Sequence, residues 1–439
     1  MTDAAATIDR LRAELGATPR ETNPYEHALL AHRLGLANAE AVTGTPDERL
    51  RQALAYFDLA ATLLDARFHP VERARVLTAA GAARRGLGET AAALDLFRRA
   101  SALAAGRVRP DEAAAMANNV GLALLELGDV PGAVERFDEA AGLFDVASAE
   151  GRRGLASALH NRGLARATGA SQSDLAAAIG DYDEAMAAVS FDDAAMHHGL
   201  VRQSRGVAAA ALAELDPESA AQWRRTALDA FTAALEVFAW PDHAVHHGIV
   251  SFNLGRMWAI GDGDDDLRRA VLGYEDAITA FDPRHQAGPW RQAYEAMTAV
   301  EQRLATGYPG WTRTDHLLAL LDADGDGAPR LMRGRLARWL PLPAAARDAA
   351  LGGYVRAAIR QGGDVGVGAL TLLLSTVIEL PVEAQSVVLD ALIAVRAAAD
   401  DDDREAVDRL VDRAVGEAVV GPQRVFVRDH LVAGGFERP

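Results

Sequence analysis

The sequence predicts an all-α protein built from repeated helix pairs, and three observations lead to that prediction. Half of the residues are apolar but only 6% are aromatic, a balance set by Ala and Leu, which favour helices over strands. An eight-residue pattern of small and apolar residues recurs with helical spacing over roughly the first 300 residues. A glycine occurs at a matched place upstream of each copy.

The recurring pattern is Ala, an aliphatic residue, two further residues, an aromatic residue, two further residues and Ala. Positions one, two, five and eight fall on one face of a helix, so each copy predicts an amphipathic helix that packs small residues and one ring against its neighbours. Six segments fit the pattern: residues 53–60, 93–100, 133–140, 178–185, 227–234 and 270–277.

A second helix is predicted upstream of each copy. Its glycine has no side chain and so lets two helices approach closely; these glycines are Gly35, Gly81, Gly121, Gly163, Gly206 and Gly255. Turn signals such as Gly128-Asp129 separate the two helices. Prolines are expected to open four of the upstream helices: Pro70, Pro110, Pro241 and Pro283. The repeated unit is therefore helix, turn, helix.

The segment Asn118-Asn119-Val120-Gly121-Leu122-Ala123, followed by Gly128-Asp129 and the third copy of the pattern, resembles a tetratricopeptide repeat. The resemblance covers residues 24–305 and implies a right-handed α-solenoid of about six helix pairs. The copies are about 40 to 49 residues apart, against 34 in the standard repeat. This spacing is similar to that of kinesin light chains and of the repeat runs beside actinobacterial caspase-like proteins. Such a protease needs Cys, which this chain lacks, so it would be a separate partner.

The resemblance also implies a binding surface. First helices of tetratricopeptide repeats line a concave groove, where an Asn two residues before the glycine often bonds the backbone of a bound peptide. A carboxamide both donates and accepts hydrogen bonds, as extended backbone requires. The predicted ligand-binding residues are His32, Arg33, Asn118, Asn119, His160, Asn161, Gln203, Ser204, Asn253 and Arg256. The alternative interpretation is that the Asn side chains cap or brace neighbouring repeats.

The repeat pattern ends after the sixth pair. We expect an N-terminal helix at residues 1–22, the solenoid at 23–306 and a C-terminal helical domain at 311–439, with Gly307-Tyr308-Pro309-Gly310 at the boundary. Two segments of the last domain, Leu342-Pro343 to Leu351 and Leu380-Pro381 to Leu389, form a faint duplication. That duplication is similar to HEAT-like helix pairs.

Composition excludes several kinds of chemistry. The chain has no Cys and no Lys, so all 45 basic residues are Arg. There can be no disulfide, cysteine nucleophile, thiolate zinc site, lysine Schiff base or phosphate-loop lysine. Gly-x-Ser-x-Gly and His-Glu-x-x-His motifs are also missing. The sequence therefore predicts no catalytic residues and no cofactor, and a stand-alone enzyme is not the favoured interpretation.

An EF-hand-like segment raises the question of a metal. Asp322, Asp324 and Asp326 match the first half of a calcium loop, but Pro329 stands where an aliphatic residue is usual and Arg333 where the bidentate Glu belongs. No metal site is predicted there, although the sequence alone leaves the question open.

Two His pairs, His197-His198 and His246-His247, occupy the same register in consecutive repeats. A shared metal ion or a pH-sensitive contact is one interpretation. Because repeat proteins duplicate residues by duplicating units, a structural role is the favoured one.

A net charge of −17 gives no attraction to nucleic acid or anionic lipid. No apolar stretch reaches the roughly 18 to 20 residues of a membrane span, and the polar N-terminus lacks a signal core, which predicts a cytoplasmic protein. The favoured function is an adaptor or scaffold that binds a protein or extended peptide in the groove. The alternatives are a self-assembling regulatory subunit, active as a homo-oligomer, and a helical enzyme or small-molecule binder.

Overall fold

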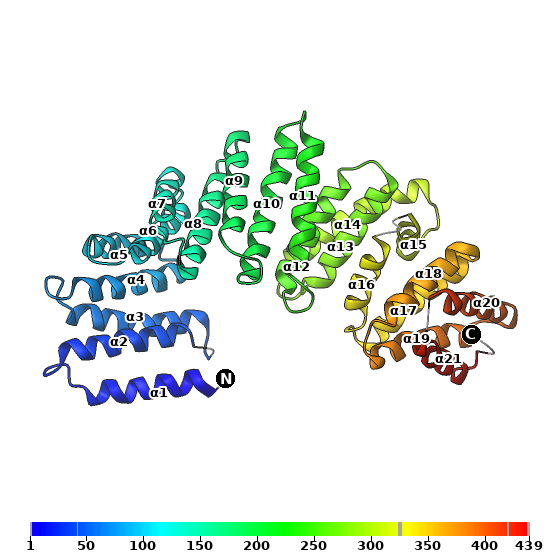
Figure 1. Cartoon of the computed structure of the whole chain (residues 1–439), viewed down its shortest axis with the longest axis horizontal. Helices are drawn as coiled ribbons and strands as arrows, with labels where there is room; N and C mark the ends of the chain where they lie inside the picture. The colour runs from blue at the N-terminus through cyan, green and yellow to red at the C-terminus, as the bar shows by residue number, and fades with distance from the viewer. Residues whose placement is uncertain (1, 42, 324–326, 419–420, 437–439) are drawn as a thin grey trace. The chain divides into compact units, whose positions relative to one another are not determined.

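The computed structural model describes residues 2–41, 43–323, 327–418 and 421–436. All regular structure within these ranges is helical, in twenty-one helices that follow one another along the chain (Figure 1). They form two compact units, Met1–Val237 and Phe238–Pro439. None of the helices in the described ranges combines the length and the apolar character that crossing a membrane requires.

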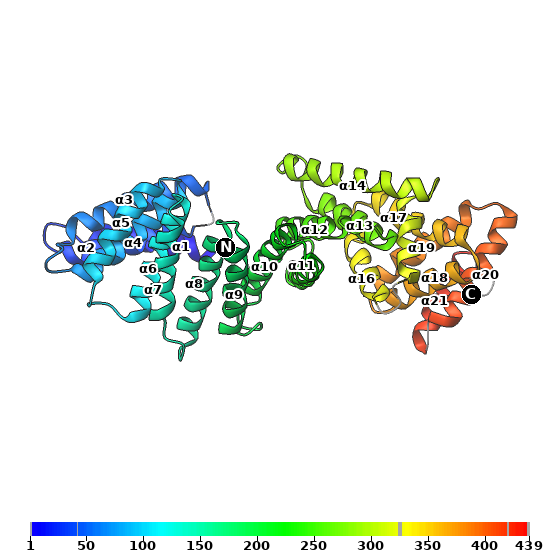
Figure 2. The same ribbon diagram turned by 90° about the horizontal axis from the view of Figure 1, so that it is seen from above.

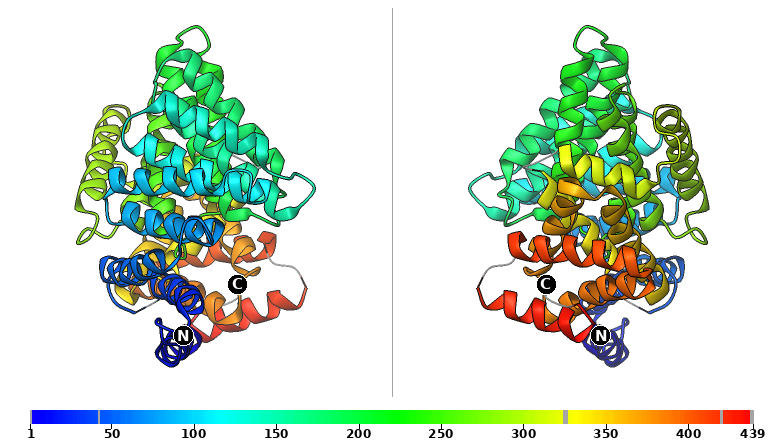
Figure 3. Two further views of the ribbon diagram at one scale, coloured as in Figure 1. Left: turned by 90° about the vertical axis from the view of Figure 1, so that its left-hand side faces the viewer. Right: turned by 90° about the vertical axis from the view of Figure 1, so that its right-hand side faces the viewer.

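The first unit is a stack of helix pairs, and Figure 3 shows the helices of its first pairs lying side by side. Several helices have proline at their first position. Proline has no backbone N–H, and an N–H at this position would have no acceptor within the helix. These prolines include Pro24, Pro46, Pro70 and Pro110. The helices are α1 (Thr2–Ala17), α2 (Pro24–Ala39), α3 (Pro46–Leu63), α4 (Pro70–Gly86), α5 (Thr90–Ala104), α6 (Pro110–Glu126), α7 (Val130–Leu143), α8 (Ala149–Ala167), α9 (Gln172–Ala188), α10 (Ala195–Leu215) and α11 (Ala220–Leu235).

Each pair is held by a ring that fills the space above a glycine. A Cβ added to Gly121 of α6 would lie 2.6 Å from Cε1 of Phe137 on α7, well inside van der Waals contact. The same arrangement recurs for Gly35 with Phe57, Gly81 with Phe97, Gly163 with Tyr182 and Gly206 with Phe231. All five rings are buried. The two patterns seen in the sequence are therefore the two halves of one contact.

The first helices of the pairs make one face of this unit, which we call the first-helix face: α2, α4, α6, α8 and α10. Successive first helices contact one another directly, and within the described residues these contacts are more extensive than those between successive second helices. A stack that is tighter on one side curves toward that side. The first-helix face is therefore the inner, concave face of the first unit.

The second unit begins with the sixth helix pair and continues into a bundle. Its helices are α12 (Ala244–Ala259), α13 (Asp264–Ala280), α14 (Ala287–Gly307), α15 (Arg313–Ala323), α16 (Ala328–Trp339), α17 (Ala344–Gln361), α18 (Gly363–Val377), α19 (Val382–Ala398), α20 (Asp401–Ala418) and α21 (Pro422–Ala433). Helix α14 packs along α13 (Figure 2). The expected boundary at residues 307–310 falls at the end of α14 and in the turn before α15.

Two glycines of α12 face rings in the sixth pair, Gly255 toward Tyr274 and Gly248 toward Phe281. The expectation that Pro241 and Pro283 open helices is wrong. Both lie in the preceding turns, because α12 and α14 begin only at Ala244 and Ala287.

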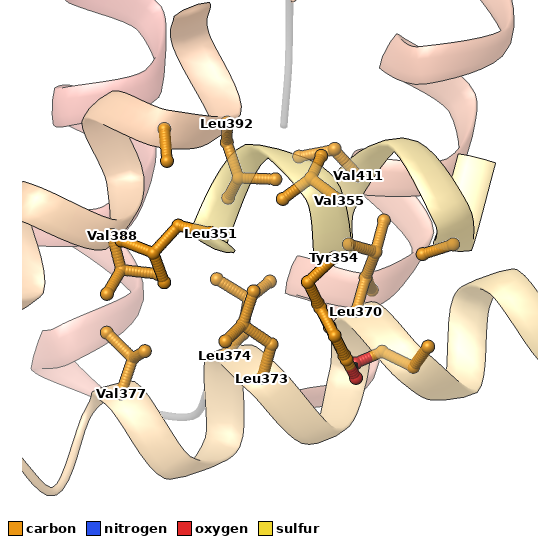
Figure 4. Packing of buried hydrophobic residues seen from close by; sticks show 14 of the residues in the cluster. Leu351, Tyr354, Val355, Leu370, Leu373, Leu374, Val377, Val388, Leu392 and Val411 are labelled. Atoms are coloured by element: carbon orange, nitrogen blue, oxygen red, sulfur yellow. Dashed lines mark hydrogen bonds between the residues drawn. The ribbon is translucent and has the colours of Figure 1, made fainter. Parts of the chain in front are cut away.

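The bundle is organised around aliphatic side chains from α17, α18, α19 and α20 (Figure 4). Tyr354 is the largest group in this core, and its hydroxyl donates a hydrogen bond of 2.9 Å to the carbonyl of Ala369. The faint duplication in the sequence marks two helix starts: Pro343 and Pro381 are the N-cap residues of α17 and α19, with nearly the same backbone angles.

Candidate functional site

Polar side chains of the first-helix face bridge neighbouring repeats. The amide Nδ2 of Asn161 on α8 donates a hydrogen bond of 3.0 Å to Oδ1 of Asn118 on α6. One residue earlier, Nε2 of His160 lies 3.0 Å from Oγ of Ser204 on α10. Four of the predicted binding residues are thus brought together in two pairs. At these positions the bracing interpretation describes what the side chains do in the free protein.

A charged contact continues this series between α4 and α6. Arg75 binds Glu112 through two hydrogen bonds, of 2.6 and 2.9 Å. The hydrogen bond from Arg75 holds the pKa of Glu112 below its ordinary value, although partial burial opposes this. No local sequence signal marks this pair, because neither residue belongs to the repeated positions and 37 residues separate them.

A hollow of about 540 Å³ opens on the first-helix face between α6 and α8. Asn118 and Asn119 form part of its wall, together with Phe144 and Ser157. Asn119 is half-buried, and the described residues offer its side-chain amide no hydrogen-bond partner. Asn119 therefore lines the hollow with an amide that makes no hydrogen bond to a described residue, unlike that of Asn161.

Some of the charged side chains around this hollow have partners within the fold, and others have none among the described residues. Asp111 accepts a hydrogen bond of 2.8 Å from the backbone N–H of Asp145, and Glu112 is held by Arg75. Arg109 and Arg153 are exposed and form no ion pair with a described residue, while Glu150 adds one exposed carboxylate. The hollow thus offers guanidinium and amide donors, which suit backbone carbonyls and carboxylates. Only packing between repeats brings these residues together, so no local sequence signal marks them.

His160 is the most strongly perturbed group of this face. Its ring packs edge-on against Tyr182 and against His197, with centroids 5.7 and 5.6 Å away. Burial, with a smaller contribution from the nearby charge of His197, lowers the pKa of His160 from 6.5 to about 4. The imidazole is therefore neutral at neutral pH.

This shift predicts acid sensitivity. In the unfolded chain His160 binds a proton near pH 6.5, but in the folded chain only near pH 4. The stability that the neutral ring contributes is complete above pH 6.5 and is lost as the pH falls toward 4, by about 2–3 kcal/mol. We expect His160→Gln to flatten the pH dependence of the urea midpoint between these limits. An NMR titration of the His160 ring with a midpoint near 6.5 would contradict the assignment.

The other predicted residues lie elsewhere. His32 packs edge-on against Phe57 at 5.9 Å, and burial lowers its pKa. Arg33 is exposed on α2 and Gln203 is half-buried on α10. Asn253 and Arg256 lie on α12, in the second unit, and so are not placed beside the residues of the first unit.

The second His of each pair has a structural role at the start of its helix. His198 lies 3.1 Å from the carbonyl of Val189, and His247 lies 2.8 Å from the carbonyl of Phe238. In both cases the carbonyl is nine residues upstream, at the end of the preceding helix or just beyond it. His27 and Arg73 make the same contact in earlier repeats, with the carbonyls of Thr18 and Leu64. The duplicated His therefore ties each helix to the chain that leads into it.

Among the residues that the structure describes, no group of three or more His, Asp or Glu side chains is placed so that it could hold one metal ion. Asp324 and Asp326 of the EF-hand-like segment lie outside the described residues. Arg333, at the position of the bidentate Glu, belongs to α16 and pairs with Glu379 at 3.3 Å.

No protein-family model and no curated protein matches the sequence. Among solved structures, the chain is similar to aspartyl phosphate phosphatase F from Bacillus subtilis, with 13% identity over 64% of this chain and 72% of that chain and a TM-score of 0.40. It is similar to the Rap conjugation gene regulator of plasmid pLS20 in complex with the Phr* peptide, with 10% identity, 90% and 96% coverage and a TM-score of 0.39. Yeast Tom70 gives 11% identity, 93% and 96% coverage and a TM-score of 0.22.

The deciding feature of the fold is the repeated contact between a glycine of one helix and a ring of the next. The fold is a tetratricopeptide-like series of helix pairs. Its six pairs carry this contact in both units, and a helical bundle follows the sixth pair.

Proposed function

We propose that this protein is an adaptor that binds an extended segment of a partner protein on the first-helix face. The observation that carries the proposal is the hollow between α6 and α8, which Asn119 lines with an amide that makes no hydrogen bond to a described residue. An extended peptide needs both donors and acceptors along its backbone, and an amide supplies both. The neighbouring pairs keep the wall of the hollow in place before a ligand arrives, which lowers the entropy cost of binding.

The charges of the hollow support the same class of ligand. Arg109 and Arg153 can donate to carbonyl or carboxylate oxygens of the peptide, while Phe144 provides an apolar surface beside them. Asn161 is less suited to direct recognition, because its amide already binds Asn118. Removing the Asn119 side chain should therefore weaken ligand binding without breaking a hydrogen bond of the fold.

The test uses peptides selected from a random phage-displayed library on the full chain. We expect Asn119→Ala to weaken a selected peptide by about tenfold in calorimetry, because a peptide group would lose its partner in a partly buried site. Gln222→Ala is the matched control, since this amide is exposed on α11, a second helix. An unchanged affinity in folded Asn119→Ala, verified by circular dichroism, would exclude the hollow as the binding site.

A further inference from the structure

The third repeat has a second hollow, on the side opposite its first-helix contacts. It is a cleft of about 580 Å³ between the second helices α5 and α7, with α6 as its floor. The floor is apolar and includes Ala113, Met116, Ala117 and Val120. This volume lies within the range of about 300–1,000 Å³ found for small-molecule sites. We call this hollow the α5–α7 cleft.

The cleft exists because the third repeat has small residues where other repeats have large ones. Eight residues before the conserved glycine stand His27, Arg73 and His198, which reach the carbonyl nine residues upstream. The third repeat has Ala113 at this position, and the fourth has Leu155. The third repeat therefore has no large side chain at this position, neither one that contacts the upstream carbonyl nor one such as Leu155 that fills the space above the floor of the cleft.

A second position decides the chemistry of the cleft. The residue just before the conserved glycine is Arg162 in the fourth repeat but Val120 in the third. Arg162 crosses the groove between its flanking second helices and donates to Asp138 on α7, at 2.7 Å, and to Asp181 on α9, at 2.6 Å. In the fourth repeat the groove is therefore filled by a cation held between two carboxylates.

In the third repeat the charges at the flanking positions are reversed, and Val120 takes the place of the central cation. Arg98 of α5 stands at the position of Asp138, one residue after the conserved ring, and Arg136 of α7 at the position of Asp181, one residue before it. Both arginines line the cleft. In the fourth repeat a cation lies between two carboxylates. By the same geometry, the group that fits between Arg98 and Arg136 is an anion attached to an apolar chain.

We propose that the α5–α7 cleft binds a small amphiphilic carboxylate, separately from the peptide groove. Its carboxylate binds Arg98, which forms no ion pair with a described residue. Arg136 stands beside it and is paired with Glu139 at 2.6 Å and with Glu135 at 3.8 Å. These two carboxylates and Asp129 also line the cleft, so Arg98 is the principal anchor. Its apolar body covers Val120 and the other floor residues. Ser101 also lines the cleft, and its Oγ is shielded from solvent without a hydrogen-bond partner in the described part of the chain.

The test follows the methyl resonance of Met116 in protein labelled with methyl-¹³C methionine and titrated with 4-phenylbutyrate. We expect a saturable shift with a Kd of about millimolar for a probe of this size. The matched probe 4-phenylbutylamine, with the same body and the opposite charge, should leave the resonance unchanged. An equal response to both probes, or none to the carboxylate, overturns the proposal.

Two variants test the position of the carboxylate and of the apolar body. Arg98→Ala changes an exposed side chain and should weaken 4-phenylbutyrate at least fivefold, while Arg99→Ala, whose side chain pairs with Asp95 and is not part of the cleft, should not. Ala113→Leu restores the bulk of the fourth repeat and should abolish the shift while the protein stays folded. If Arg98→Ala and Arg99→Ala bind equally well, the charge assignment is wrong.

Discussion

Replacing Arg335 by alanine is expected to lower the free energy of unfolding of the second unit by about 2–3 kcal/mol, because the partly buried Glu275 would lose its counter-ion and Asp276 would lose one of its two. The Arg335 side chain is 3% exposed, and its Nη1 lies 2.7 Å from Glu275 and 3.4 Å from Asp276, both on α13. Arg338 joins the same cluster at 2.9 Å from Asp276. These contacts connect the sixth helix pair to α16. Urea denaturation followed by far-ultraviolet circular dichroism measures the effect.

The pH dependence identifies the mechanism. Burial by itself would raise the pKa of Glu275, but the charge of Arg335 and its hydrogen bond hold this pKa below its ordinary 4.5. The stability that ionised Glu275 contributes is present above pH 4.5 and is lost as the pH falls through the lowered value. The difference between wild type and Arg335→Ala should therefore be largest above pH 5 or so and shrink in acid.

A matched control separates charge burial from the loss of a surface cation. Arg409 forms an exposed pair with Glu405 within α20, with side chains 69% and 78% exposed. Arg409→Ala should change the stability by no more than about 0.5 kcal/mol. A cost for Arg335→Ala as small as this would show that the cluster contributes nothing to the stability of the second unit.

The helix pairs could be predicted from the sequence because their signal is local. Gly121 and Phe137 are close in the chain, each lies at a fixed place in an amphipathic helix, and the same relation recurs at six places. The contacts between repeats could not be predicted in this way. Arg75 and Glu112, or His160 and Ser204, are tens of residues apart, and which of them meet depends on the rotation of one pair against the next.

The same limit applies to the candidate sites. The repeat pattern predicted Asn118, Asn119 and Asn161 as equivalent binding residues. It could not show that the Asn161 amide donates to Asn118, whereas the Asn119 amide lines the hollow without a partner among the described residues. The α5–α7 cleft was missed because small residues such as Ala113 look unremarkable in an Ala-rich chain. Only comparison with the braces at the same register in other repeats shows that a side chain is missing.

The contact between Gly121 and Phe137 predicts a coupled pair of mutational effects. Phe137→Ala should cost about 3–5 kcal/mol, because the ring is fully buried. Gly121→Ala in the wild-type background should cost about 1–3 kcal/mol, since its Cβ would meet a ring that cannot move aside. In the Phe137→Ala background this second cost should vanish, because the clashing atoms are gone. A double-mutant cycle in urea measures the coupling.

Gly180 provides a control for the sign of the stability change that a Gly→Ala substitution causes. It lies inside α9, is exposed, and an added Cβ would meet nothing within 4 Å. Gly180→Ala should therefore raise the stability by about 0.5–1 kcal/mol, because alanine loses less backbone entropy in a helix. The same substitution is thus expected to have opposite effects at Gly121 and Gly180, and only the ring of Phe137 accounts for the difference. Equal effects at the two sites would mean that helix propensity, and not the contact between glycine and ring, determines which residue each repeat requires there.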